Sequence, residues 1–232
     1  MKVAVLGTGM VGQTLALALS AKGHDVRFGT RGVAQSLAST QPNGYGMPSF
    51  GIWHKDHSAI DVQTFAAAAQ WGDLLINATN GGVSLEALAH ANAGSVGNKV
   101  LIDVANDLDF SKGMPPASRS SDVAGAGLAE KIQAAYPNLR VVKTLNTMNA
   151  LVMLNPGLVA GGDSTVFMSG NDTAAKALVN ELLQSFGWKD IMDLGDITSS
   201  RAVEMLMPIW LRAYGVLGQT PYNFKIVLIG HT

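Results

Sequence analysis

The feature that most constrains this chain is a short apolar strand that leads directly into a glycine-rich turn. The strand is predicted for Lys2-Val3-Ala4-Val5-Leu6, and the turn is Gly7-Thr8-Gly9-Met10-Val11-Gly12. Apolar residues then recur at helical spacing as far as Gly23, which can end a helix, and residues 26–29 are predicted as a second strand.

In units of this kind the glycines let backbone N–H groups approach a pyrophosphate, and the helix N-terminus faces the anion. The pattern therefore predicts a Rossmann-type dinucleotide-binding unit. A glycine turn without a ligand is the alternative. The residues of the turn that we expect at the cofactor are Gly7, Thr8, Gly9, Met10, Val11 and Gly12.

The end of the second predicted strand indicates which dinucleotide is bound. An NAD site usually has Asp or Glu there for the ribose 2′-OH, whereas this chain has Thr30 and Arg31. Its nearest acid, Asp25, lies at the opposite end of the strand. A hydroxyl beside a guanidinium suits a phosphate dianion, since arginine forms charge-assisted, bidentate hydrogen bonds. The sequence predicts NADP rather than NAD. The alternative is that Arg31 is an ordinary solvated loop residue.

Composition excludes several other functions. A net charge of −1 without a basic run predicts neither nucleic acid nor an anionic membrane surface as a partner, and we expect no membrane span. The absence of cysteine excludes disulfides and thiolate chemistry and is compatible with a reducing cytoplasm, where we place the protein. Charged residues make up only 14% of the chain, against about a quarter in typical soluble domains, so extensive burial is expected, including burial between subunits.

The rest of the chain alternates between apolar strands and helices, as in a doubly wound parallel sheet that is covered on both faces. Further strands are predicted at residues 73–78, 99–104, 140–145, 165–169 and 189–194. Because ligands of such sheets gather at the carboxyl ends of strands, the small and polar residues there should line the nicotinamide half of the site. Ordinary turn chemistry is the alternative for each of them. These residues are Ala78, Thr79, Asn80, Asn106, Asn146, Met148 and Ala150.

Two segments, residues 32–61 and 109–123, are rich in loop-forming residues and are predicted to lie near the site, with a short helix at 33–40. His54 and His57 fall in the first segment without a third ligand nearby, so we expect a solvated loop rather than a metal site. A long closing helix is predicted at residues 196–217, kinked at Pro208, with an apolar face that serves the core or a dimer contact.

Four segments of the chain resemble a known family: residues 2–12, 28–31, 142–156 and 167–203. The most specific stretches are Lys143-Thr144-Leu145-Asn146-Thr147-Met148-Asn149-Ala150, Ser169-Gly170-Asn171-Asp172, Asp193-Leu194-Gly195 and Ser200-Arg201. Over nearly its whole length the chain resembles the NADP oxidoreductases that depend on the deazaflavin coenzyme F-420, and their relatives among bacterial reductases. The later stretches also resemble the NADPH domain of the six-transmembrane metalloreductases, which passes hydride to a flavin.

The resemblance implies a Rossmann domain, residues 1–150, and a small C-terminal α/β part, residues 151–232, that closes a cleft, usually in a homodimer. It also implies that Thr8, Thr30 and Arg31 bind the NADP phosphates and that the backbone of residues 148–150 lies beside the nicotinamide carboxamide. The chain departs from the family at the acceptor side, where Asn80 and Asn149 replace common prolines, and at the phosphate rim, where Gln35 replaces a basic residue.

The usual catalytic constellations are absent from the sequence. No tyrosine is followed four residues later by the lysine of a Tyr-x-x-x-Lys pair, which could help to protonate a carbonyl. Hydride exchange between a nicotinamide and a flavin-like ring requires chiefly stacking at close range, because the cofactors carry the chemistry. We therefore predict no catalytic side chain and an NADP(H)-dependent oxidoreductase that transfers hydride to or from a deazaflavin or flavin. The alternatives are an NADPH-dependent reductase of a small imine, quinone or carbonyl compound, and an NADP-sensing protein without turnover.

Overall fold

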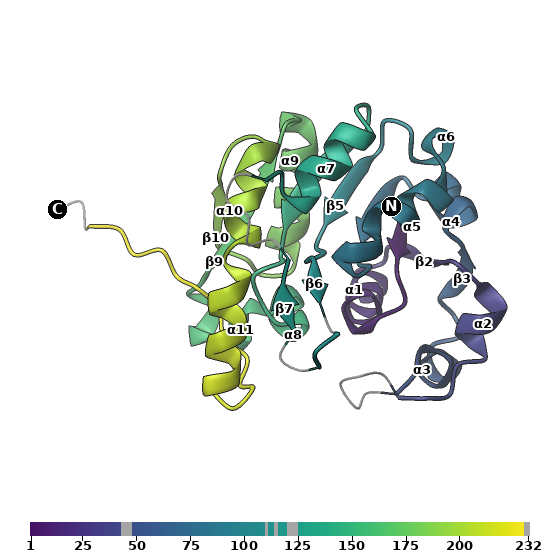
Figure 1. The fold of residues 1–232 in the computed structure, drawn as a ribbon, viewed down its shortest axis with the longest axis horizontal. Helices are drawn as coiled ribbons and strands as arrows, with labels where there is room; N and C mark the ends of the chain where they lie inside the picture. The colour runs from purple at the N-terminus through teal and green to yellow at the C-terminus, as the bar shows by residue number, and fades with distance from the viewer. Residues whose placement is uncertain (43–47, 110, 114–115, 120–124, 230–232) are drawn as a thin grey trace.

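The computed structural model describes residues 1–42, 48–109, 111–113, 116–119 and 125–229. Its main feature is an eight-stranded sheet with helices on both faces and the strand order β10-β9-β8-β5-β4-β1-β2-β3 (Figure 1). Neighbouring strands are parallel except β8 and β9, which run antiparallel. The prediction of a Rossmann-type α/β fold is confirmed. The strands of the sheet are β1 Lys2–Leu6, β2 Asp25–Thr30, β3 Asp61–Thr64, β4 Leu74–Asn77, β5 Val100–Asp103, β8 Arg140–Thr144, β9 Thr165–Gly170 and β10 Asp190–Asp193.

The strand order reverses direction between β1 and β4. From β1 the chain adds β2 and β3 on one side, and it then returns to place β4, β5 and β8 on the other side. In open α/β sheets this reversal is where ligands bind, at the carboxyl ends of the strands. Leu6 lies opposite Asn77, Asn77 opposite Asp103, and Asp103 opposite Lys143, so the register aligns four strand ends at one edge of the sheet.

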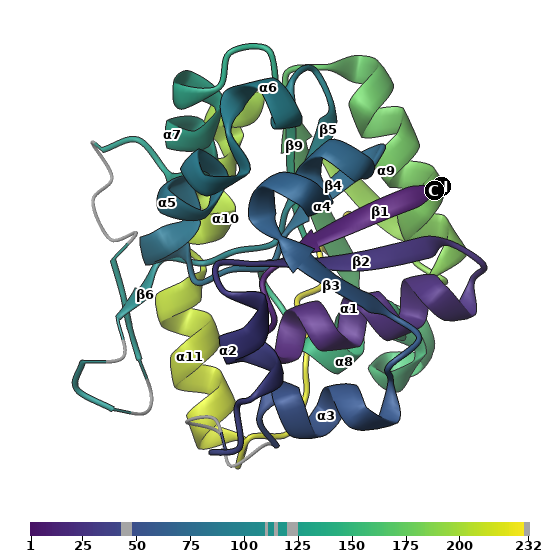
Figure 2. The ribbon, with the colours of Figure 1, turned by 90° about the vertical axis from the view of Figure 1, so that its right-hand side faces the viewer.

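Alternating side chains of β1 enter two different apolar layers, as expected for a strand that is buried on both faces. Val3 and Val5 belong to the layer that includes α1, α8 and α9 residues, whereas Ala4 and Leu6 belong to the layer that includes α4, α5 and α7 residues. Figure 2 shows α1 and α8 on one face and α4 and α5 on the other. The α-helices are α1 Met10–Ala21, α2 Val33–Leu37, α3 Phe50–Asp56, α4 Phe65–Trp71, α5 Gly81–Ala91, α6 Ala93–Val96, α7 Leu128–Ala135, α8 Ala150–Leu154, α9 Thr173–Ser185, α10 Ser200–Glu204 and α11 Met207–Val216.

The segment 32–61 is more regular than we predicted. It contains α2, which is shorter than the expected helix, then α3 and the edge strand β3, while residues 43–47 lie outside the described part. The prediction of a solvated loop at His54 and His57 is wrong. His54 is on α3, and the His57 ring stacks on Trp53 with ring centroids 4.3 Å apart. The Ser49 side chain caps α3, and Phe50 packs edge-on against Phe28 of the core, which fixes the helix despite its proline- and glycine-rich approach.

The segment 109–123 is only partly described, since residues 110, 114–115 and 120–124 lie outside the described part. The described residues form a small antiparallel ribbon, β6 Leu108–Asp109 with β7 Ala117–Ser118. Arg119 pairs with Asp107 at 3.4 Å and with Asp109 at 3.3 Å, which ties the two sides of the ribbon together. That this segment lies near the site stays a prediction.

The single closing helix that we predicted at residues 196–217 is wrong. The chain forms a 3-10 turn at Ile197–Ser199, then α10 and α11. Pro208 lies in the first turn of α11, where its missing N–H is not needed, so it begins a helix instead of kinking one. Beyond α11 the chain first packs against β9, where the N–H of Thr165 donates to the carbonyl of Phe224 at 2.9 Å, and its end then extends away from the body of the molecule (Figure 1). Among the described residues no helix is both long and apolar enough to cross a membrane.

Candidate functional site

The glycine turn after β1 has the geometry that the sequence predicts. Gly7 has φ +114°, and a Cβ atom there would lie 2.6 Å from the carbonyl oxygen of Ala78. A Cβ atom at Gly12 would lie 2.3 Å from the carbonyl oxygen of Gly7. A Cβ atom at Gly9, in contrast, would meet nothing within 4 Å. Packing therefore requires glycine at two of the three positions, and the third faces open space that a ligand can enter.

The N-terminus of α1 lies at this open space and suits an anion. The backbone of Gly9 caps the helix without any side-chain hydrogen bond, and the first turn contains no acid. The first intrahelical bond of this end runs from the N–H of Gln13 to the carbonyl of Gly9, at 2.9 Å. The N–H groups of Met10 and Val11 therefore have no acceptor within the helix, and the helix dipole favours a negative charge beside them.

A cavity of about 150 Å³ lies beside the turn, between β2 and α5. Thr30 is buried, and its Oγ1 lies 2.8 Å from the Ser36 hydroxyl, whereas the Arg31 side chain is 72% exposed. Phe65, Val83 and Ala87 give the cavity an apolar wall of the kind that packs on a purine. The remaining lining residues are Gly7, Thr8, Glu86 and His90. The sequence analysis missed the wall that α5 contributes.

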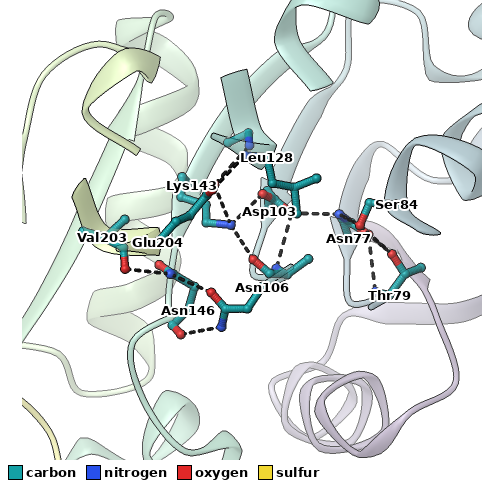
Figure 3. Close-up of polar contacts among 12 residues, drawn as sticks. Asn77, Thr79, Ser84, Asp103, Asn106, Leu128, Lys143, Asn146, Val203 and Glu204 are labelled. Carbon is teal, nitrogen blue, oxygen red and sulfur yellow. Dashed lines mark hydrogen bonds and ion pairs between the residues drawn. The ribbon is translucent and has the colours of Figure 1, made fainter. Parts of the chain in front are cut away.

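The polar turns after β1, β4, β5 and β8 lie side by side, in the order that the sheet imposes. Gly7 lies against Ala78 and Thr79, and the N–H of Gly81 donates to the carbonyl of Asn106 at 3.0 Å. The side chains of Asn106 and Asn146 then face each other: Asn106 donates to the Asn146 carbonyl at 2.7 Å, and Asn146 donates to Asn106 Oδ1 at 3.0 Å (Figure 3). The structure thus brings together the strand-end residues that the sequence analysis selected.

Other members of that set, and the neighbouring Asn149, are held in local structure. Asn80 caps α5 by accepting from the N–H of Gly82 at 2.9 Å, and Asn149 caps α8 by accepting from the N–H of Leu151 at 2.9 Å. Met148 and Ala150 are buried, and the Met148 side chain is part of the main apolar core. The residues of this last turn therefore offer backbone groups to a ligand more readily than side chains.

A buried polar network lies beneath these turns, and the sequence analysis missed it (Figure 3). Lys143 donates to Asp103 at 2.9 Å and to the carbonyl of Ala105, and its ammonium group lies 3.3 Å from Glu204. Asn77 donates to the other oxygen of Asp103 at 2.7 Å. Lys143 and Asp103 are fully buried, so the strand ends of β4, β5 and β8 are joined by side chains that solvent does not reach.

The network extends to both sides of the sheet edge. Asn77 accepts from the Thr79 hydroxyl at 2.7 Å and donates to Ser84 on α5 at 3.0 Å. Glu204 on α10 accepts from the N–H groups of Leu128 and Ala129, at 2.7 and 3.1 Å, at the start of α7. The network therefore fixes the turn after β4 and the C-terminal helices relative to the same sheet edge.

Two carboxylates flank the single ammonium group of this network. Burial alone lowers the pKa of Lys143, but Asp103 and Glu204 outweigh it and raise that pKa above its ordinary value, so Lys143 stays charged. Burial raises the pKa of Asp103, although Lys143 acts in the opposite direction. The sequence carried one signal: an aspartate and a lysine that each directly follow a run of apolar residues in a strand. Their pairing depends on the register of β5 and β8.

Comparison with known proteins identifies the family of this chain. The family model described as NADP oxidoreductase, coenzyme F420-dependent, matches residues 2–107. A crystal structure from Arthrobacter sp. FB24, provisionally described as an F420-dependent NADP reductase, is 49% identical in sequence with a TM-score of 0.91. The match covers 98% of this chain and 100% of that one. The chain belongs to the family of F420-dependent NADP oxidoreductases.

More distant structures share the fold of this family. A Streptomyces aurantiacus imine reductase matches with TM-score 0.59 and 16% identity, over 94% of this chain and 64% of that one. A reductive aminase from Aspergillus terreus, in complex with NADPH and ethyl levulinate, matches with TM-score 0.59 and 15% identity, over 94% and 62%. Among curated proteins, none matches the chain significantly. The family membership makes this protein an NADP-dependent oxidoreductase.

Proposed function

We propose that this NADP-dependent oxidoreductase transfers hydride between NADPH and a planar acceptor of the deazaflavin or flavin type. The observation that carries the proposal is the composition of the edge where the strands β4, β5 and β8 end. Thr79, Asn106 and Asn146 supply only hydroxyl and amide groups there, and they are hydrogen-bonded within the protein. Asp103 and Lys143 are ionisable, but they are buried beneath the edge in an ion pair.

An edge of this composition suits a reaction between two rings. Reduction of a ketone or imine needs a proton donor at the substrate, whereas exchange between a nicotinamide and a flavin-like ring needs positioning in a dry environment. Asp107, which follows Asn106 in the sequence, is a partly exposed acid next to this edge. Its carboxylate forms an ion pair with Arg119 at 3.4 Å. The Arthrobacter relative, whose description names F420, supports a deazaflavin as the acceptor.

The cofactor-binding part of the proposal assigns each half of NADP to a described feature. We place the pyrophosphate at the open space over Gly9, on the N–H groups of Met10 and Val11. We place the adenosine in the cavity beside Phe65 and Val83, with the 2′-phosphate on Thr30 and Arg31. NADPH, when bound, supplies the hydride.

The nicotinamide half would then extend along the remaining strand ends. Ala78 and Thr79 lie next to Gly7, and Asn80, Asn106 and Asn146 continue the same edge. We propose that the backbone of residues 148–150 orients the carboxamide, since the side chains of Met148 and Ala150 are buried in the core. The role of the protein is to bind and orient both rings and to exclude water.

We also propose that the protein works as a homodimer. Val227, Leu228 and Ile229, in the segment beyond α11, are 82%, 72% and 92% exposed. A run of apolar side chains that is this exposed is typical of a surface that another chain covers. Light scattering on the full chain should give twice the mass of the 24.2 kDa chain. A monomer at micromolar concentration would contradict the proposal.

The hydride acceptor is tested with NADPH that carries deuterium at C4, in separate (4R)- and (4S)-labelled forms. We expect one of the two labelled forms, and not the other, to lose its deuterium when coenzyme F-420 or free flavin is reduced, as measured by mass spectrometry of the NADP product. With coenzyme F-420 the label should also appear on carbon in the reduced acceptor, whereas reduced flavin exchanges it from nitrogen with water, so flavin reduction is followed by absorbance. Transfer only to an imine, quinone or carbonyl compound would contradict the proposed acceptor. Tight NADPH binding without transfer to any acceptor would identify a sensing protein instead.

A further inference from the structure

The cavity beside the glycine turn contains a carboxylate that neither the sequence nor the family assigns to a role. Glu86 extends from α5 toward Arg31, and its Oε1 lies 3.2 Å from Nη1 of the guanidinium. His90, one turn later on α5, has its Nε2 3.6 Å from the same oxygen. All three side chains line the cavity of about 150 Å³. The arginine that we expect to bind a phosphate therefore already forms an ion pair with a carboxylate.

The position of Glu86 is fixed by its helix. Ala87 and Leu88 are buried in the core, so the backbone that carries Glu86 is held in place, while its side chain is 53% exposed and can turn. A carboxylate and a phosphate engage the same planar N–H groups of arginine. Arg31 cannot offer the same N–H groups fully to both, and the two anions would also repel each other at this distance.

We propose that Glu86 lowers the selectivity for NADPH over NADH by competing with the 2′-phosphate of NADP for Arg31. Glu86 engages Nη1 of Arg31, so NADPH must displace the carboxylate to gain the full set of guanidinium hydrogen bonds, whereas NADH, which has no 2′-phosphate, leaves the Arg31–Glu86 pair intact. Once displaced, Glu86 keeps His90 as a polar neighbour on its own helix. Glu86 thus reduces the preference for NADPH that Arg31 provides. This inference rests on the proposed binding of the 2′-phosphate at Arg31.

The test is a double-mutant cycle on the full chain with Glu86→Gln, Arg31→Ala and the double variant. Dissociation constants for NADPH and NADH are measured by calorimetry in a buffer without polyvalent anions, at constant ionic strength. We expect Glu86→Gln to tighten NADPH binding about threefold to fivefold, the upper range for an exposed ion pair, and to change NADH binding by less than about twofold. In the Arg31→Ala background the gain for NADPH should fall below about twofold.

Glu181→Gln is the matched control, since it removes the same charge from an exposed position on α9, outside the cavity. If Glu86→Gln leaves NADPH affinity unchanged or weakens it while Arg31→Ala weakens it, the competition is refuted and the placement of the phosphate stands. An equal gain with and without Arg31 also refutes it, because Glu86 would then act by charge repulsion alone. If Arg31→Ala leaves NADPH affinity unchanged, the proposed placement of the phosphate itself fails.

Discussion

The ammonium group of Lys143 lies 2.9 Å from the carboxylate of Asp103, and neither side chain is exposed to solvent. The two residues are register partners on the neighbouring parallel strands β5 and β8. Glu204, on a helix that begins 57 residues after Lys143 in the sequence, completes the group at 3.3 Å. A buried ion pair of this kind is weak evidence of net stability, but it fixes the elements that carry it relative to one another. Here those elements support the edge at which we place the nicotinamide.

Replacing Lys143 with methionine should strongly destabilise the fold. The change leaves two buried carboxylates without their cation, and loss of one partner of a buried pair typically costs about 3–5 kcal/mol of unfolding free energy. Urea denaturation measures the effect. Lys176→Met is the control, because Lys176 pairs with the partly exposed Asp193 and should lose about 1 kcal/mol or less. Equal losses in the two variants would show that the buried group does not hold the strands together.

The contact between Arg201 and Glu130 predicts a loss of stability in acid. The guanidinium donates to both oxygens of Glu130, at 2.8 and 2.6 Å, and this lowers the pKa of Glu130 below its ordinary value of 4.5. A group whose pKa is lower in the folded state than in the unfolded state stabilises the fold at pH values above its unfolded-state pKa. That contribution is lost as the pH falls through the folded-state pKa. The difference in unfolding free energy between the unmodified chain and Glu130→Gln should be constant from pH 7 to about pH 5 and shrink below that. A difference that grows toward low pH would contradict the assignment.

The sequence predicted those features that local patterns determine. The glycine turn, the buried strands and the helix after the turn follow from periodicity within short windows, and the structure confirms this helix as α1, which ends before Gly23. The helix α3 was missed because its signal is the packing of Phe50 and Trp53 on Phe28, which lies 22 residues before Phe50. The prolines and glycines before α3 dominate the local pattern, and Ser49 is the local signal that could have marked the start of this helix.

The residues of the candidate site also divide into those that local sequence patterns select and those that only the tertiary structure reveals. Thr79, Asn106 and Asn146 could be selected because each follows a recognisable strand, and the topology brings such ends together. Lys143 and Glu204 could not be paired without the register of β8 and the place of α10. The contact of Glu86 with Arg31 could not be predicted either, because the face of α5 that meets Arg31 depends on how that helix lies over the sheet. Sequence patterns indicate which positions reach the edge, and tertiary packing decides what they contact there.

Arg31→Ala should remove most of the preference for NADPH over NADH. Hydrogen bonds to a charged group contribute about 1.5–3 kcal/mol, so NADPH binding should weaken on the order of tenfold to a hundredfold while NADH binding changes little. Arg31→Lys keeps the charge without the planar, bidentate geometry. Its affinity for NADPH should therefore lie between those of the unmodified chain and Arg31→Ala. Calorimetry gives these affinities, with Arg212→Ala on α11 as a control at an exposed arginine. Equal affinity of the unmodified chain for the two dinucleotides would contradict the assignment of NADP to this pocket.

Two glycines of the same turn should respond to substitution in opposite ways. A side chain at Gly9 meets nothing within 4 Å, and its backbone has φ −73° and ψ 177°, which valine adopts readily. Gly9→Val should therefore keep the fold, within about 1 kcal/mol for a change of N-cap residue, yet bind both dinucleotides more than about a hundredfold more weakly. Gly12→Ala places its Cβ atom 2.3 Å from a backbone carbonyl and should instead lower the unfolding free energy by about 1–3 kcal/mol or more. Urea denaturation and calorimetry on the two variants separate the effects. Normal dinucleotide binding by a folded Gly9→Val variant would place the pyrophosphate somewhere other than the N-terminus of α1.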